Sequence, residues 1–128
     1  MTQGHRITVM PADLHVEVSV NGVKVAESDQ PVLLEETGLP TRYYLPREHV
    51  REEVLRPTKS ETTCPFKGQA SYWSVELDDE VHADLVWSYE SPIPQAEGVK
   101  GLLCFYNERV DLVVDGEALE RPVTPYST

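Results

Sequence analysis

The stretch VEVSVNGVKV, residues 16–25, decides the fold class of this chain. Valines alternate with polar residues on both sides of a central Asn-Gly, and both of these turn residues tolerate positive φ. The pattern therefore predicts two antiparallel strands joined by a two-residue turn. The turn length predicts that Val20 pairs with Val23 and Val18 with Val25, with the valines on one face.

Outward from this hairpin, short strand-like runs recur with turn residues between them, which is typical of a mostly β domain. Strands are expected at 32–36, 42–45, 67–77, 83–90, 102–107 and 110–115. The last two are expected to pair as a hairpin, and 83–90 to place Leu85, Trp87 and Tyr89 on one face. Two turns of helix are expected over 47–54, one over 95–100, a loop over 56–64 and a loose tail after Leu119.

Length and charge restrict the class of protein. A chain of 128 residues fits one domain, 1–128. Eleven basic against twenty-two acidic residues give a net charge of −11, which argues against a nucleic-acid partner and is typical of a soluble protein. No apolar run reaches the ~20 residues of a membrane span, and no signal peptide is recognisable, so a cytoplasmic location is expected.

Metal and cofactor motifs are not recognisable in the sequence. Cys64 and Cys104 do not form a CxxC pair, and the four histidines have no ligand spacing. There is no Walker loop and no Gly-rich dinucleotide fingerprint. We therefore expect neither a bound metal nor a cofactor.

Four motifs carry a resemblance to a known family: YYLPREHV (43–50), TTCPFKGQASYW (62–73), VWSYESPIP (86–94) and GLLCFYNERVDLVVDG (101–116). In this order they resemble the bacterial and fungal domain of unknown function family 427, over about residues 16–116. The resemblance implies a β-tent-like fold of two antiparallel sheets with one or two short helices. Methionine sulfoxide reductase B and the drug-binding domain of cereblon share that fold.

The chain departs from those fold relatives in its chemistry. It lacks the two CxxC pairs that usually hold their zinc, and Cys104 is only loosely placed for a reductase cysteine. The family also carries a nucleotidyltransferase-like label. The chain has no Gly-Ser motif followed by paired metal-binding Asp residues, so that activity is not expected.

The first functional hypothesis is a small-molecule-binding domain with an aromatic cleft between the two sheets. Aromatic residues on facing strands can stack a planar ring or hold a cation. Arg, Lys and Tyr side chains can orient an anionic group. The candidate ligand-binding residues are Trp73, Trp87, Tyr89, Tyr44 and Arg47, with Lys67 beside them.

Two other hypotheses remain open. A nearby ammonium stabilises a thiolate, so Cys64 assisted by Lys67 is a candidate nucleophile or redox thiol, with His49 or His82 as the base. Equally, Cys64 can be a small buried side chain at the start of a strand. The third hypothesis is a structural or interaction module, with a homodimer formed through an exposed strand edge.

Overall fold

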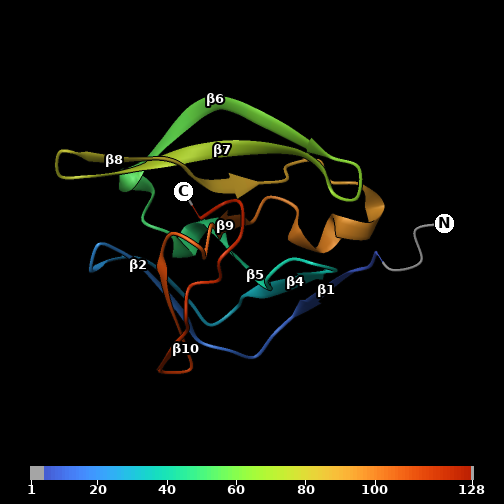
Figure 1. The fold of residues 1–128 in the computed structure, drawn as a ribbon, viewed down its shortest axis with the longest axis horizontal. Helices are drawn as coiled ribbons and strands as arrows, with labels where there is room; N and C mark the ends of the chain where they lie inside the picture. Colours follow the sequence, from blue (N-terminus) through green and yellow to red (C-terminus); the bar gives the residue numbers. More distant parts are fainter. Residues whose placement is uncertain (1–4, 128) are drawn as a thin grey trace.

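Two antiparallel sheets form the molecule in the computed structural model, which describes residues 5–127. The larger sheet has seven strands in the order β1 (Ile7–Pro11), β4 (Val32–Glu36), β5 (Arg42–Leu45), β9 (Leu103–Phe105), β8 (Glu80–Ser88), β7 (Gly68–Leu77) and β6 (Leu55–Cys64). The smaller has the order β11 (Glu117–Ala118), β10 (Asp111–Val114), β2 (Val16–Val20) and β3 (Val23–Ser28). Figure 1 shows the long strands β6, β7 and β8 arching over the rest of the chain. The mostly β fold class is confirmed.

The hairpin of β2 and β3 turns at Asn21 and Gly22, whose φ angles are 49° and 82°. These left-handed conformations match the right-handed twist of the two strands. Val20 pairs with Val23, so the predicted turn is confirmed.

Beyond the turn, the predicted pairing of Val18 with Val25 is wrong, because Val18 pairs with Ala26 instead. A β-bulge adds one residue to β3 at this point and shifts the register. Val18 and Val25 are both buried in the same core all the same. The bulge changes the pairing without exposing the apolar side chains.

The space between the two sheets is a packed hydrophobic core. It contains Val16, Val18, Val20, Val25, Ala26, Leu45, Val50, Val54, Leu55, Trp73, Val75, Leu85, Val86, Leu103, Phe105, Val110 and Leu112. Because these side chains fill the interface, the expected ligand cleft does not lie between the sheets.

A second, smaller core lies on the opposite face of the seven-stranded sheet. It contains Leu34, Tyr44, Ala70, Tyr72, Trp87, Tyr89, Ala96, Val99 and Cys104. Alternation along β5 and β9 divides neighbouring residues between the two cores. Leu103 faces the first core, for example, and Cys104 the second. This second face carries the candidate site.

A bulge in β8 separates Leu85 from the aromatic residues that follow it. Trp73 pairs with Val86 and Val75 with His82, so β8 has two more residues than β7 over this interval. Leu85 consequently joins the core between the sheets, whereas Trp87 belongs to the second core. The expectation that Leu85 shares the face of Trp87 and Tyr89 is wrong, whereas Trp87 and Tyr89 do lie in the same core.

Two local predictions around residue 55 are also wrong. The expected loop at 56–64 is the edge strand β6, which pairs only with β7 and is mostly exposed, so no apolar alternation marks it. The expected helix over 47–54 is two single 3-10 turns, η1 (Arg47–His49) and η2 (Glu52–Val54). The backbone between these turns bonds to β3 instead, since Arg51 N–H donates to the Val25 carbonyl at 2.9 Å.

The predicted hairpin over 102–115 is wrong because its two strands belong to different sheets. β9 lies between β5 and β8 in the larger sheet, and β10 pairs with β2 in the smaller one. The turn predicted over 95–100 is the 3-10 helix η3 (Pro94–Val99). Its Ala96 and Val99 cover the second core.

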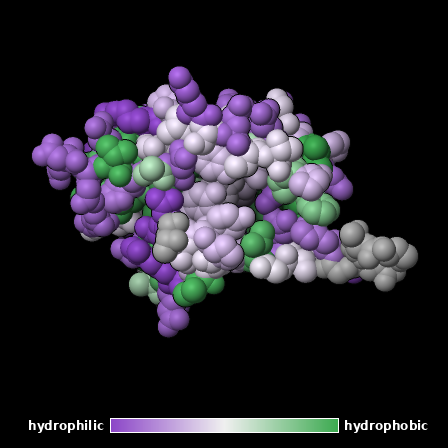
Figure 2. Space-filling model, turned by 45° about the horizontal axis from the view of Figure 1, so that its top comes forward, coloured by the Kyte–Doolittle hydropathy of each residue, from purple (hydrophilic) through white to green (hydrophobic). Residues whose placement is uncertain are grey.

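The surface in Figure 2 is mostly hydrophilic, and hydrophobic residues form only small separate groups on this face. The large exposed hydrophobic residues come from scattered parts of the chain: Met10, Val23, Val81, Leu119, Val123 and Tyr126. The face shown has no broad apolar patch of the kind that marks a stable protein interface.

Gly68 should be sensitive to substitution, because its φ of +122° lies in a region almost reserved for glycine. An added Cβ would lie 3.2 Å from Pro92 Cα and 3.3 Å from the Ser91 carbonyl oxygen. We expect Gly68→Ala to lower the free energy of unfolding by about 2–3 kcal/mol, measured by urea denaturation.

Gly101→Ala is the matched control, since φ is +73° there and no atom lies within 4 Å of the added Cβ. It should cost about 1–2 kcal/mol, the usual penalty of a left-handed Ala. Equal losses for both variants would show that the contact with the 91–93 backbone has no energetic importance.

Candidate functional site

A pocket of about 410 Å³ opens on the second face of the seven-stranded sheet. Its lining residues come from β4, β5, β6, β7 and β8, from the turns after β4 and β6, from the segments that follow β8 and β9, and from both terminal segments. They are His5, Glu36, Leu39, Arg42, Thr62, Thr63, Cys64, Pro65, Phe66, Lys67, Tyr72, Trp87, Tyr89, Tyr106 and Tyr126. The pocket is therefore aromatic, with charged groups on its walls.

Trp87 is the most firmly held ring of the pocket. Its Nε1–H donates to the Tyr44 hydroxyl at 3.0 Å, and Tyr44 is fully buried behind it. The Tyr106 ring lies 4.4 Å from the Trp87 ring, centroid to centroid. Burial raises the pKa of Tyr44 well above its usual value, so this hydroxyl stays neutral and keeps the indole in place.

Hydroxyl groups link the pocket's tyrosines to β6. Tyr72 OH lies 2.8 Å from Thr62 Oγ1 and 3.4 Å from Tyr106 OH. Burial, together with the hydrogen bond to Tyr72, raises the pKa of Tyr106. Tyr106 thus stays neutral to a higher pH than an ordinary tyrosine does.

Arg42 brings a buried positive charge to the pocket. It donates to Glu108 through Nη1 at 2.5 Å and Nη2 at 3.0 Å, and Nη1 also donates to Asn107 Oδ1. Although burial opposes ionisation, the hydrogen bond from Arg42 holds the pKa of Glu108 below its usual range. The guanidinium carbon lies 5.2 Å from the Trp87 ring centroid, within cation–π distance.

Lys67 brings the second buried charge. Its Nζ lies 2.6 Å from Glu36 Oε1 and 5.8 Å from the centroid of Tyr89. The other oxygen of Glu36 bonds to His5 Nε2 at 3.0 Å, and the His5 ring stacks on Phe66 at 3.8 Å. A chain of charged and aromatic groups therefore forms one wall of the pocket.

The two cysteines lie in different environments. Cys64 is half-buried, lines the pocket and begins the turn in which its carbonyl accepts the Lys67 N–H at 3.1 Å. Cys104 is fully buried, and burial raises the pKa of its thiol to about 12. Cys64 is thus the thiol that a reagent or ligand in the pocket can reach.

The structure brings five of the sequence-predicted site residues together. Cys64, Lys67, Trp87 and Tyr89 line the pocket, and Tyr44 supports Trp87 from behind. The Lys67 ammonium pairs with Glu36 across the pocket wall.

The other two predicted residues lie elsewhere. Trp73 belongs to the core between the sheets, on the far side of β7. Arg47 covers the Trp73 ring at 5.1 Å and pairs with Glu52 at 2.7 Å. Both are away from the pocket because successive side chains of β7 point to opposite faces.

The candidate bases for Cys64 are also distant from the pocket lining. His49 Nδ1 bonds to Ser28 Oγ at 2.8 Å, and His82 Nε2 lies 3.1 Å from Glu80. His5 is the histidine that lines the pocket, and its place in the N-terminal segment gave no signal in the sequence.

Sequence reasoning missed Glu36, Arg42, Tyr72, Tyr106 and Tyr126. For Arg42 a signal existed, since it lies two residues before Tyr44 in a predicted strand and therefore shares its face. For Glu36 and Tyr126 there was none, because their partners lie far away in the chain.

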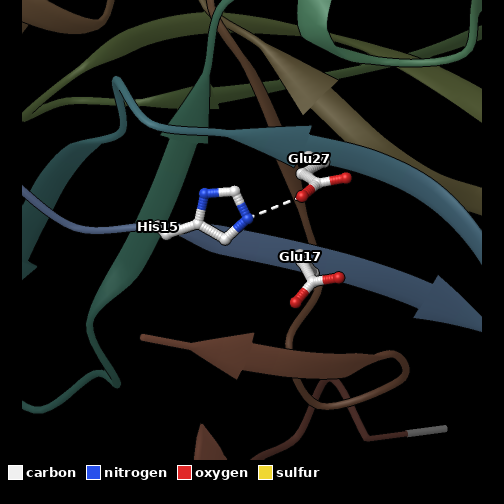
Figure 3. A group of neighbouring side chains, drawn as sticks. All are labelled: His15, Glu17 and Glu27. Carbon is white, nitrogen blue, oxygen red and sulfur yellow. Dashed lines mark hydrogen bonds and ion pairs between the residues drawn. The ribbon is translucent and has the colours of Figure 1, made fainter. Parts of the chain in front are cut away.

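A separate group of His15, Glu17 and Glu27 lies on the small sheet and could hold a metal ion (Figure 3). His15 and Glu27 face one another with Nε2 and Oε2 2.6 Å apart. The Lys24 ammonium, however, already lies 2.7 Å from Glu17 and 3.0 Å from Glu27. We interpret the group as an exposed ion network that Lys24 neutralises.

This network leads to a prediction about the pKa of His15. Hydrogen bonds to Asp29 and to Glu27 raise the pKa of His15. The stability that they contribute is complete below the pKa of His15 in the unfolded chain and is lost as the pH rises through the folded value. An NMR titration should therefore show His15 holding its proton above its usual pKa.

Asp29→Asn should lower the pKa of His15. The control is Asp78→Asn, in the turn between β7 and β8, which should leave the pKa of His15 unchanged. If the titration of His15 is the same in all three proteins, the network is not formed in solution.

The sequence profile of a family described as a domain of unknown function, DUF427, matches residues 8–116. A search of curated proteins found no relative that matches the chain. Among residues 5–127, no helix is long and apolar enough to cross a membrane.

Proposed function

The chain belongs to the DUF427 family, whose function is unknown, and we propose from the geometry of its pocket that it is a small-molecule-binding β domain. The ligand is a planar ring with an anionic group. Within residues 8–116, five aromatic side chains line the pocket: Phe66, Tyr72, Trp87, Tyr89 and Tyr106. Rings of this kind bind flat ligands by offset stacking and by excluding water.

One observation carries the anionic part of the proposal. Arg42 and Lys67 are the buried basic residues of the part of the chain that the structure describes, and both line this pocket. The chain as a whole has a net charge of −11. Glu108 and Glu36 offset the cost of burying these two cations, but N–H donors remain unused on both, which favours an anion-binding role in so acidic a protein.

The hydrogen-bond partners of these two cations indicate which of them binds the anionic group of the ligand. Arg42 uses three of its five N–H donors on Glu108 and Asn107. Lys67 has one carboxylate partner, Glu36, and an ammonium has three donors. Lys67 therefore keeps the larger share of its donors for the anionic end of a ligand, while Trp87 and Tyr89 hold its ring.

Anilinonaphthalenesulfonate, a planar aromatic anion, is a suitable probe, with uncharged anilinonaphthalene as its matched analogue. We expect Lys67→Met to weaken binding of the anion by about tenfold, the loss of one charge-assisted contact. The neutral analogue should bind the variant and the wild type alike. Fluorescence titration of the folded proteins measures both affinities.

Lys100→Met is the control, since Lys100 is exposed and does not line the pocket. Because the anionic probe also binds partly unfolded proteins, each variant must retain the near-UV circular dichroism of the wild type. Equal losses for both probes, or for both lysine variants, would contradict a specific role of Lys67.

Native mass spectrometry of the gently purified protein gives an independent test. An extra mass that is lost on denaturation, and is reduced in Trp87→Phe, supports the pocket and identifies the ligand class. The same spectrum tests the homodimer hypothesis. β6 is an edge strand, but it carries Pro57, Lys59 and a register irregularity, features that discourage strand pairing between molecules.

A second candidate function, an enzyme that uses Cys64, rests on its position in the pocket lining. The hydrogen bonds of the described residues join the Lys67 ammonium to Glu36 and not to the Cys64 thiol. Iodoacetamide should modify Cys64 and leave the buried Cys104 unmodified, as mass spectrometry of peptides will show. If Cys64→Ser leaves probe affinity unchanged and no thiol-dependent activity is found, the binding function alone remains.

A further inference from the structure

The C-terminal segment 119–127 returns to the pocket that the strands build. It follows β11 and lies outside the family match at residues 8–116. Figure 1 shows this red segment ending near the middle of the molecule. Its Tyr126 ring stacks on the Tyr106 ring with 5.6 Å between centroids and an interplanar angle of 29°. A tyrosine from the tail thus lies on one of the pocket's own aromatic walls.

The tail is held in place by the carboxylate that also holds Arg42. Thr124 Oγ1 donates to Glu108 Oε2 at 2.6 Å, and the same oxygen of Glu108 accepts from Arg42 Nη2 at 3.0 Å. Within the tail, the Tyr126 N–H donates to Thr124 Oγ1 at 3.0 Å. The position of Tyr126 is therefore coupled through Glu108 to the buried cation of the pocket.

A second hollow of about 410 Å³ lies on the other side of Tyr126. It shares Thr62, Tyr72, Tyr106 and Tyr126 with the pocket. Its remaining lining is polar and consists of Ser60, Glu61, Asp84, Arg109 and Pro125. Tyr126 is thus one of the four residues that line both hollows.

The tail is largely exposed to solvent and buries little surface against the rest of the domain. Tyr126 is 48% exposed and Val123 is 93% exposed. The segment forms no strand or helix in the described part of the chain. Its specific contacts to the pocket are the Thr124 hydrogen bond and the Tyr126 stack. Segments with so few buried contacts open at low free-energy cost.

We propose that the tail is an autoinhibitory strap, and that Tyr126 occupies the place on Tyr106 that the ring of a long planar ligand takes. This inference rests on the proposed binding function. The ligand displaces the phenol of Tyr126, gains the stack on Tyr106 and reaches the polar hollow beyond. Displacing Tyr126 costs every ligand some affinity. A flat aromatic ligand that extends past the pocket regains part of this affinity through its own stack on Tyr106, so the strap favours such ligands over shorter ones.

The test uses the full-length protein and anilinonaphthalenesulfonate. Tyr126→Ala removes the competing ring and should strengthen probe binding by about two- to tenfold, the equivalent of one aromatic stacking interaction. Thr124→Val, which removes only the hydroxyl that bonds to Glu108, should act in the same direction. Tyr126→Phe and Thr124→Ser keep the contacts and should bind as the wild type does.

Fluorine NMR of protein labelled with fluorotyrosine reports the strap itself. The Tyr126 signal, assigned by its absence in Tyr126→Phe, should move toward the solvent-exposed position in Thr124→Val. Saturating the wild type with the probe should move it the same way. An unmoved signal in the probe-saturated protein, or equal or weaker binding by Tyr126→Ala, overturns the strap and leaves the binding pocket intact.

Failure of the proposed function gives a different result. If the probe binds neither the wild type nor Tyr126→Ala, the binding function fails and the strap fails with it. Binding by Tyr126→Ala alone would support both, because the tail would then close the pocket completely.

Discussion

The candidate site depends on the ion pair between Arg42 and Glu108. It joins β5 to the segment after β9, and both partners are at most 5% exposed. Two charges in such a place must neutralise each other, since leaving one unpaired typically costs about 3–5 kcal/mol. The pair fixes the guanidinium beside Trp87 and Tyr106, and through Thr124 it also fixes the tail. The positions of the aromatic pocket walls, of the buried positive charge and of the C-terminal tail therefore all depend on this ion pair.

The seven-stranded sheet supports the site by dividing its side chains between two faces. Leu103 and Phe105 pack against the small sheet, and Cys104 between them faces the opposite way. The first face is a packed core, which gives the sheet rigidity. The second is only partly covered by η3, so aromatic residues there remain at the surface of a pocket. A stable core and a face that carries the candidate pocket are thus products of the same strands.

Predictions from the sequence succeeded where the controlling interaction is local. Asn21-Gly22 fixes a hairpin because the φ preferences of the two residues suffice. Asp115-Gly116 forms the same kind of turn between β10 and β11, whereas the predicted hairpin joined 102–107 to 110–115. Predictions failed at the β-bulges, because extra residues shift the pairing register and, in β8, place Leu85 and Trp87 on different faces, without altering the composition of the strand.

The sequence by itself determined the β class, the first hairpin, the family and four of the residues that line the pocket. Local φ preferences and alternation carry that information. Only the tertiary structure decided that Trp73 lies in the core while Tyr72 lines the pocket, and that Glu36, Glu108 and Tyr126 complete the site. The reason is physical. Pairings between residues that are 31, 66 or 20 positions apart depend on strand order and register, and no local sequence pattern encodes these.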